Sequence, residues 1–63
     1  MPLAQITLVE GASESQKRAL IAKITDAIAE SLDQPPQAVR VLLNEIPAAH
    51  WGVAGVSMKD RAT

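Results

Sequence analysis

The sequence predicts a single α+β domain, made of one βαβ unit with a C-terminal hairpin. Two short apolar segments, residues 3–9 and 38–46, alternate from side to side as β-strands do, and one amphipathic helix lies between them. After the second strand, Gly52 and Gly55 have a spacing that suits a tight turn. We therefore expect one domain over residues 1–63, with two parallel strands joined by a right-handed crossover.

The first predicted strand, residues 3–9, has no properly polar face. Its side chains divide into two sets, Ala4, Ile6 and Leu8 on one side and Leu3, Gln5, Thr7 and Val9 on the other. Both faces of this strand are therefore expected to be covered. The segment from Glu10 to Ala12 ends the strand.

The predicted helix begins after Ser13, where Gln16 completes a capping box. Glu14 suits the positive end of the helix, and it has the right spacing to pair with Arg18. One apolar stripe follows at spacings of three and four: Leu20, Ile21, Ile24, Ala27, Ile28 and Leu32. The segment 33–36 ends the helix because its two prolines do not fit helical geometry, which leaves about nineteen helical residues.

The second predicted strand, residues 38–46, also has two faces. Val39, Val41 and Leu43 share one face, and Arg40, Leu42 and Asn44 share the other. Pro47 ends the strand, and residues 51–56 form the expected hairpin. The polar tail, residues 57–63, is expected to be mobile or to be ordered only by a neighbouring chain.

Composition excludes several classes of protein. The chain has no cysteine and one histidine, which argues against disulfides and against a zinc site within one chain. Its net charge of −1, with both signs scattered, does not favour binding to nucleic acid. The longest strictly apolar run has four residues, far fewer than the roughly 20 needed to span a membrane. No targeting segment precedes the first strand, so we expect a cytoplasmic protein.

Self-association is the expected source of stability. A chain of this size buries only about 60% of its unfolded surface, and a staple is usually needed. A two-stranded sheet with one helix also leaves its second face bare, and here that face carries leucine and valine. Because disulfides and metals are excluded as staples, the predicted fold calls for an oligomer.

Conventional catalytic residues are few. A Ser-His-Asp triad would have to use His50, but the four serines have ordinary explanations as helix caps, helix surface or tail. A lone histidine near a hairpin is more often a surface or structural residue than a ligand. The two glycines of the hairpin are too close together for a phosphate-binding or dinucleotide-binding motif.

Pro2 and Arg40 are less ordinary. Removal of Met1 would leave Pro2 with a free secondary amine, and α-amino groups titrate at about 7.7–8.0, a value that burial lowers. Such an amine can act as a base near neutral pH. Arg40 places a charge inside an apolar strand, so it lies either at a sheet edge or facing a site. Each residue alone is compatible with a purely structural role.

Taken together along the chain, these features resemble the 4-oxalocrotonate tautomerase family. The matching segments are Met1-Pro2 before a strand, Glu10-Gly11 after it, Ser13 to Gln16, Leu32-Asp33 before Pro35, Val39 to Val41, and His50 to Gly55. They cover essentially all 63 residues in order. The resemblance implies a tautomerase-like fold in which two subunits pair into a four-stranded sheet, and a homohexamer built as a trimer of dimers.

The resemblance also implies the chemistry. Pro2 would be the general base that moves a proton between oxygen and carbon of an enol or dienol 2-oxo acid, such as 2-hydroxymuconate, without a cofactor. Arg40 would bind the 2-oxo and carboxylate groups from a neighbouring subunit. Trp51, where the family usually has phenylalanine, would form the pocket wall, and Leu8 would contribute to substrate binding. No metal, nucleic acid or membrane enters this function.

One departure from the family pattern concerns Ala12. Well-known members have an arginine directly after the Glu-Gly pair, where it binds the distal carboxylate of a dicarboxylate substrate. In this chain Arg61 and Arg18 are the candidates to replace it.

Two alternatives to the tautomerase function stay open: a member with another activity, such as decarboxylation of an oxo acid, and a non-catalytic subunit of a hetero-oligomer. Residues 51–56 contain no carboxylate to activate water, which argues against a hydrolytic dehalogenase.

Overall fold

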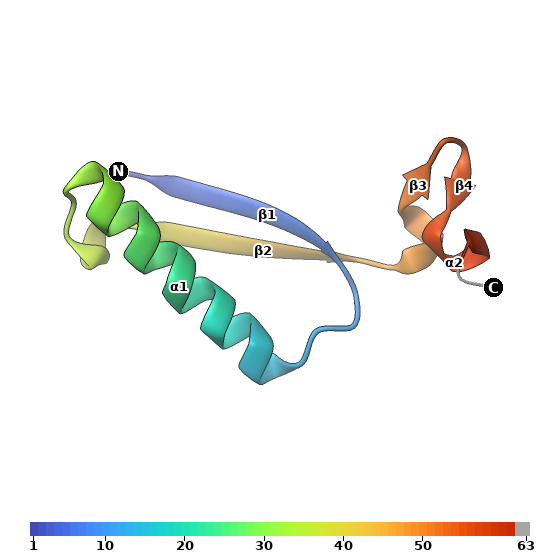
Figure 1. The fold of residues 1–63 in the computed structure, drawn as a ribbon, viewed down its shortest axis with the longest axis horizontal. Helices are drawn as coiled ribbons and strands as arrows, with labels where there is room; N and C mark the ends of the chain where they lie inside the picture. Colours follow the sequence, from blue (N-terminus) through green and yellow to red (C-terminus); the bar gives the residue numbers. More distant parts are fainter. Residues whose placement is uncertain (62–63) are drawn as a thin grey trace.

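A computed structural model describes residues 1–61 of the chain (Figure 1). The elements follow in the order β1 (Leu3–Val9), α1 (Glu14–Leu32), η1 (Pro36–Ala38), β2 (Arg40–Ile46), η2 (Ala48–His50), β3 (Gly52–Val53), β4 (Val56–Ser57) and α2 (Met58–Arg61). The two η elements are single turns of 3₁₀-helix. The predicted βαβ unit with a C-terminal hairpin is confirmed.

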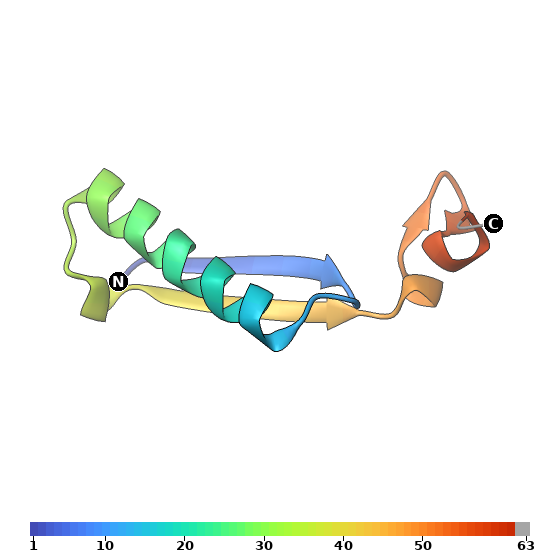
Figure 2. The same ribbon diagram turned by 60° about the horizontal axis from the view of Figure 1, so that its bottom comes forward.

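The two long strands form a parallel pair, and α1 crosses one face of it (Figures 1 and 2). Their register runs from Leu3 opposite Arg40 to Val9 opposite Ile46. The backbone N–H of Arg40 donates to the carbonyl of Pro2 at 3.0 Å, and the N–H of Glu10 donates to the carbonyl of Ile46 at 2.9 Å. These two hydrogen bonds extend the backbone pairing of β1 and β2 by one residue at each end.

Both ends of α1 follow the predicted signals. The Ser13 hydroxyl accepts a hydrogen bond from the Gln16 backbone N–H at 3.1 Å, and the Gln16 side-chain oxygen accepts one from the Ser13 N–H at 2.8 Å. At the other end Asp33 takes the left-handed conformation with φ 51°, and its N–H donates to the Ala29 carbonyl. Aspartate tolerates this conformation better than most residues, so the helix stops before the prolines.

The second strand begins later than predicted, at Arg40 rather than at residue 38. Pro36 starts the 3₁₀ turn η1, in which Ala38 and Val39 donate to the carbonyls of Pro35 and Pro36 at 2.9 and 3.1 Å. Proline suits the first position of a helical turn because its φ angle is fixed and it needs no partner for an N–H. The local turn therefore uses the N–H groups that a longer strand would have paired.

The predicted hairpin is confirmed. The prediction that the tail is mobile or ordered only by a neighbouring chain is wrong for residues 57–61, because Ser57 ends β4 and residues 58–61 form helix α2 within the single chain. Ala54 and Gly55 both have positive φ angles, 53° and 84°, as a two-residue hairpin turn requires. After β4 the Ser57 hydroxyl accepts from the Asp60 N–H at 3.2 Å, which caps the short helix α2. Residues 62–63 lie outside the described part of the chain.

The core is thin. Within residues 1–61 Val39 is the single buried apolar side chain, with 8% of its surface exposed. Alternate strand residues, including Ala4, Ile6, Val41 and Leu43, are half-buried on the face that α1 covers. From α1 itself Leu20, Ile24 and Ile28 are half-buried, whereas Ile21 and Leu32 of the predicted stripe are exposed.

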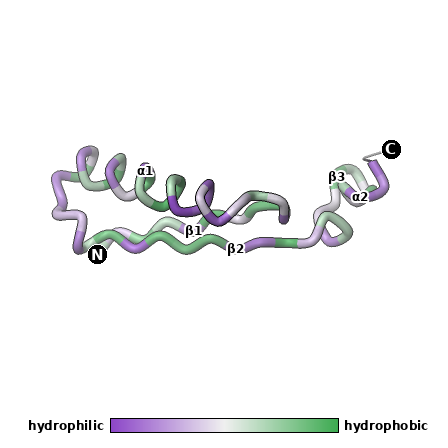
Figure 3. Tube along the Cα trace, turned by 90° about the horizontal axis from the view of Figure 1, so that it is seen from below, coloured by the Kyte–Doolittle hydropathy of each residue, from purple (hydrophilic) through white to green (hydrophobic). Residues whose placement is uncertain are grey.

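The opposite face of the sheet is bare, with Leu3 56% and Leu42 49% exposed. Figure 3 shows α1 on one side of the strand pair and the hairpin set apart at the far end. The chain measures 44 × 24 × 13 Å, and its radius of gyration is 14.7 Å, whereas a compact chain of this length has about 10.6 Å. An elongated chain with an uncovered apolar face needs a partner to complete its core, as the sequence predicted.

We expect the purified protein to be an oligomer, with a hexamer of about 40 kDa from six chains of 6.7 kDa each. The physical reason is the bare sheet face, which no other described segment of the chain covers. Sedimentation equilibrium at micromolar concentration measures this mass directly. A folded monomer under those conditions would contradict the prediction.

Candidate active site

Pro2 lies immediately before β1, at the end of the sheet where β2 begins (Figure 1). It is half-buried, and its carbonyl accepts the hydrogen bond from the Arg40 N–H described above. Met1 is 87% exposed, so its removal would cost the chain little packing. The fold thus brings two of the predicted site residues, Pro2 and Arg40, side by side.

Arg40 lies on the sheet face that α1 leaves bare, next to Leu3 and Leu42. Its guanidinium Nη1 donates to the carbonyls of Gln37 at 2.9 Å and Val39 at 3.4 Å. Both ion pairs among residues 1–61 involve Lys17, so no carboxylate in this part of the chain neutralises Arg40. An exposed guanidinium that lacks a carboxylate partner is suited to bind an anion.

Trp51 and Leu8 lie at the other end of the sheet. Trp51 follows η2, beyond the carboxyl end of β2, and its carbonyl accepts from the Met58 N–H at 2.7 Å. Leu8 is half-buried near the end of β1, opposite Glu45. The seven residues of β2 span roughly 20 Å at about 3.3 Å each. One chain therefore does not bring Trp51 or Leu8 to Pro2, and their roles in the site stay predictions.

The loop between β1 and α1 carries Ala12. Gly11 precedes it with a φ angle of 140°, a conformation that side-chain-bearing residues rarely adopt, so glycine is needed there. Ala12 is half-buried, and it lies at the same end of the sheet as Leu8 and Glu45. Of the two arginines considered as replacements, Arg18 is exposed on α1, whereas Arg61 is on α2 beside the hairpin.

A charged cluster at this end of the sheet was missed by sequence reasoning. The Lys17 ammonium is 2.8 Å from Glu45 and 3.0 Å from Glu14, so Glu14 pairs with Lys17 and the predicted pair with Arg18 is wrong. The hydrogen bond to Glu45, and after it the one to Glu14, raise the pKa of Lys17 above its ordinary value. Glu45 is 28 residues away in sequence, so no local pattern predicts this contact.

The described part of the single chain holds no other obvious site. Residues 1–61 form no pocket, and they contain no group of three or more His, Cys, Asp or Glu side chains placed to hold a metal ion. None of the helices among these residues is long and apolar enough to cross a membrane. The pair formed by Pro2 and Arg40 is therefore the best candidate for the reactive part of a site.

The fold is that of a tautomerase. Residues 2–61 match the family model described as tautomerase enzyme, and the chain belongs to that family. The protein is therefore an enzyme of the isomerase class, related to 4-oxalocrotonate tautomerase.

Its relatives carry the same activity in their names. The chain is 48% identical over 60 residues to a 2-hydroxymuconate tautomerase of Comamonas testosteroni, with 95% of each chain covered. It is 54% identical over 56 residues to a probable tautomerase of Ralstonia nicotianae, which covers 89% of this chain and 80% of the relative.

Solved structures agree with the sequence relatives. A 4-oxalocrotonate tautomerase homologue of the tomaymycin biosynthetic pathway has a TM-score of 0.94 and 41% identity, over 98% of this chain and 97% of its own. A heterohexameric 4-oxalocrotonate tautomerase of Chloroflexus aurantiacus has a TM-score of 0.92 and 40% identity, over 95% and 97%. The tautomerase fold predicted from the resemblance is confirmed.

Proposed function

We propose that this protein is a cofactor-free tautomerase of enol or dienol 2-oxo acids, with 2-hydroxymuconate as the first substrate to assay. The observation that carries the proposal is the position of Pro2, half-buried directly before β1 and joined to the sheet through its carbonyl alone, which accepts from the Arg40 N–H at 3.0 Å. The exposed guanidinium of Arg40 lies on the bare sheet face, where it can serve the site of a neighbouring subunit. The names of the relatives from Comamonas testosteroni and Pseudomonas putida support the choice of substrate.

In the proposed reaction Pro2 acts as the base once Met1 has been removed. Its neutral secondary amine accepts the proton of the enol hydroxyl, and the electron pair of that O–H bond becomes the new carbonyl π-bond. The displaced π-electrons then take the same proton from Pro2 at a carbon of the conjugated chain. The proton returns to the substrate, so the reaction is an isomerisation with no other reactant.

Arg40 stabilises the charge that develops during this transfer. As the hydroxyl proton leaves, negative charge grows on the oxygen at C2, next to the substrate carboxylate. A guanidinium can bind both groups through its forked donors, and the interaction strengthens as the charge grows. Arg40 thus lowers the barrier as well as binding the substrate.

A neighbouring subunit completes the proposed pocket with Trp51 and Leu8. One chain keeps these residues at the opposite end of the sheet from Pro2, so the two groups can meet only between copies. An apolar wall excludes water and disfavours the protonated form of the amine, which keeps Pro2 available as a base. Tautomerase relatives that assemble as hexamers and trimers support this arrangement, and we propose a homohexamer.

A second candidate function is that of one subunit in a hetero-oligomer. The heterohexamer of Chloroflexus aurantiacus, at 40% identity, favours it. The alanine at position 12 favours it too, because a second type of chain could supply the arginine that the resemblance leads one to expect. Activity of the purified single chain separates the two candidates, since a subunit that needs its partner is inactive alone.

Protein that retains Met1 is expected to be inactive although correctly assembled. The nitrogen of Pro2 is then an amide, which is not basic, and loss of a general base costs about 10²- to 10⁴-fold in rate. Intact mass together with turnover of 2-hydroxymuconate and phenylenolpyruvate tests this. Equal activity of retained and processed forms in the same oligomer would exclude Pro2 as the base.

Arg40→Ala is expected to lower both kcat and kcat/KM, by roughly a hundredfold, because the guanidinium binds charge that grows toward the transition state. Arg18→Ala is the matched control, since Arg18 is exposed on α1 and lies outside the proposed site. A variant with raised KM and unchanged kcat would show that Arg40 only binds the substrate.

Ala12→Arg is expected to improve a dicarboxylate substrate relative to a monocarboxylate one. A restored charged contact is worth about 1.5–3 kcal/mol, or at most about a hundredfold. The half-buried position of Ala12 adds a steric cost, which the ratio of kcat/KM for the two substrates cancels. An unchanged ratio in a correctly assembled protein would mean that position 12 does not face the distal end of the substrate.

A further inference from the structure

The bare face of the strand pair has a polar centre. Residues two apart on a strand share a face, and the register places Gln5, Thr7 and Asn44 next to one another, with Thr7 directly opposite Asn44. All three side chains are exposed, and we call them the polar patch. Four apolar side chains flank the polar patch on the same face: Leu3, Leu42, Val9 and Ile46.

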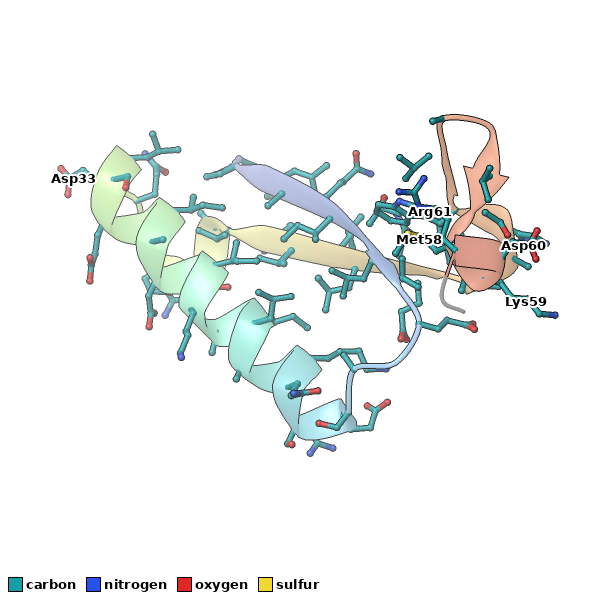
Figure 4. The ribbon with its side chains drawn as sticks, turned by 45° about the vertical axis from the view of Figure 1, so that its right-hand side comes forward. Asp33, Met58, Lys59, Asp60 and Arg61 are labelled. Atoms are coloured by element: carbon teal, nitrogen blue, oxygen red, sulfur yellow. The ribbon has the colours of Figure 1, made fainter. Side chains whose placement is uncertain are left out.

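The polar patch has no hydrogen-bond partner within its own chain. Among residues 1–61, the side-chain amides of Gln5 and Asn44 and the hydroxyl of Thr7 take part in no hydrogen bond. Helix α1 lies on the opposite face of the sheet, and the side chains of α2 gather at the hairpin end of the molecule (Figures 3 and 4). In the single chain only water can satisfy the three polar groups.

Assembly takes the polar patch out of water. The flanking side chains Leu3 and Leu42 are 56% and 49% exposed, and a surface that covers the apolar residues on both sides of the patch also covers the patch. A buried amide or hydroxyl without a partner costs free energy, so buried polar groups are nearly always hydrogen-bonded. The surface that covers this face must therefore offer donors and acceptors at its centre.

A second copy of this chain offers such a surface. In a closed symmetric oligomer every copy brings the same face. An amide and a hydroxyl each donate and accept hydrogen bonds, so the polar patch is complementary to itself. The patch also carries no charge, so it gives no electrostatic preference for a different, charged chain.

We propose that the polar patch is the contact that aligns copies of this chain in the oligomer. The patch of one copy hydrogen-bonds to the patch of another within an apolar surround. Apolar contacts are non-directional, whereas these hydrogen bonds are satisfied in one alignment only. A single buried polar residue fixes the register of a coiled coil for the same reason.

This alignment also bears on the candidate site. Arg40 lies on the same face as Asn44, about 13 Å along β2 at about 3.3 Å per residue. An alignment fixed at the polar patch therefore fixes where the guanidinium of one copy lies relative to the neighbouring copy. The inference needs the oligomer but not the proposed chemistry.

The decisive experiment uses Thr7→Val and Asn44→Leu, two nearly isosteric changes, each alone and both together. Sedimentation velocity on dilution gives the protein concentration at which the oligomer is half dissociated. Each single change leaves a buried group unpaired, so we expect this concentration to rise about ten- to a hundredfold. The double change removes both partners and should bring it back to within about threefold of the wild type. Gln5 is unchanged in all variants and cancels in the comparison.

Gln34→Leu is the matched control, because it removes an exposed amide in the loop after α1, away from the bare face. It should leave the half-dissociation concentration unchanged. A cross-link gives a second readout that does not depend on the stability of the apolar variants. Since the chain has no cysteine, Thr7→Cys places one thiol in the polar patch and Gln34→Cys places one outside it. A short bis-maleimide should join two assembled Thr7→Cys chains and leave Gln34→Cys chains separate.

Three results would overturn the inference. Unchanged association in both single variants would mean that the polar patch stays in water in the oligomer. Losses that add in the double variant would mean that Thr7 and Asn44 do not pair with each other between copies. An intact Thr7→Cys oligomer without cross-links would mean that the patches of two copies do not meet. None of these measurements uses turnover, so this inference and the proposed function can each fail while the other stands.

Discussion

The bare face of the two-stranded sheet is the constraint on which the rest of this structure depends. Helix α1 covers one face, and the other keeps Leu3 and Leu42 about half exposed. Val39 is the single buried apolar side chain in residues 1–61, so one chain has too little core to be stable alone. Association therefore supplies part of the folding free energy itself, and folding and assembly are expected to be coupled.

The same constraint explains why the candidate site is divided. An elongated chain of 44 Å keeps the starts of β1 and β2, with Pro2 and Arg40, at one end, and the hairpin with α2, which follow Trp51, at the other. When copies pack on their bare faces, the ends of different chains can meet, and each new contact that buries apolar surface can also close a pocket. The proposed site therefore requires assembly, because one copy keeps Pro2 at the opposite end of the sheet from Trp51.

The elements that depend only on residues near them in the sequence were predicted correctly. The β1 strand, the capping box of Ser13 and the turn at Gly55 each depend on neighbours within a few residues, and all three were found. The pair of Lys17 with Glu45 depends on how α1 lies across the sheet, so sequence alone missed it. Helix α2 was missed because four residues are too few for a periodic pattern, and its formation depends on the Ser57 cap and the Trp51 carbonyl. The arrangement of the site between copies was expected only through the family resemblance.

The position of Pro2 shows how a short chain can hold its proposed base without supporting side chains. A residue at the start of a strand can join the ladder through its carbonyl alone, and Pro2 does so with the Arg40 N–H. Its nitrogen stays outside the ladder, so the processed chain would keep a free lone pair there. The register that pairs Leu3 with Arg40 also sends the guanidinium to the bare face, whereas a one-residue shift of β2 would send it under α1. The backbone register of β1 and β2 thus fixes the sheet face on which the Arg40 guanidinium lies.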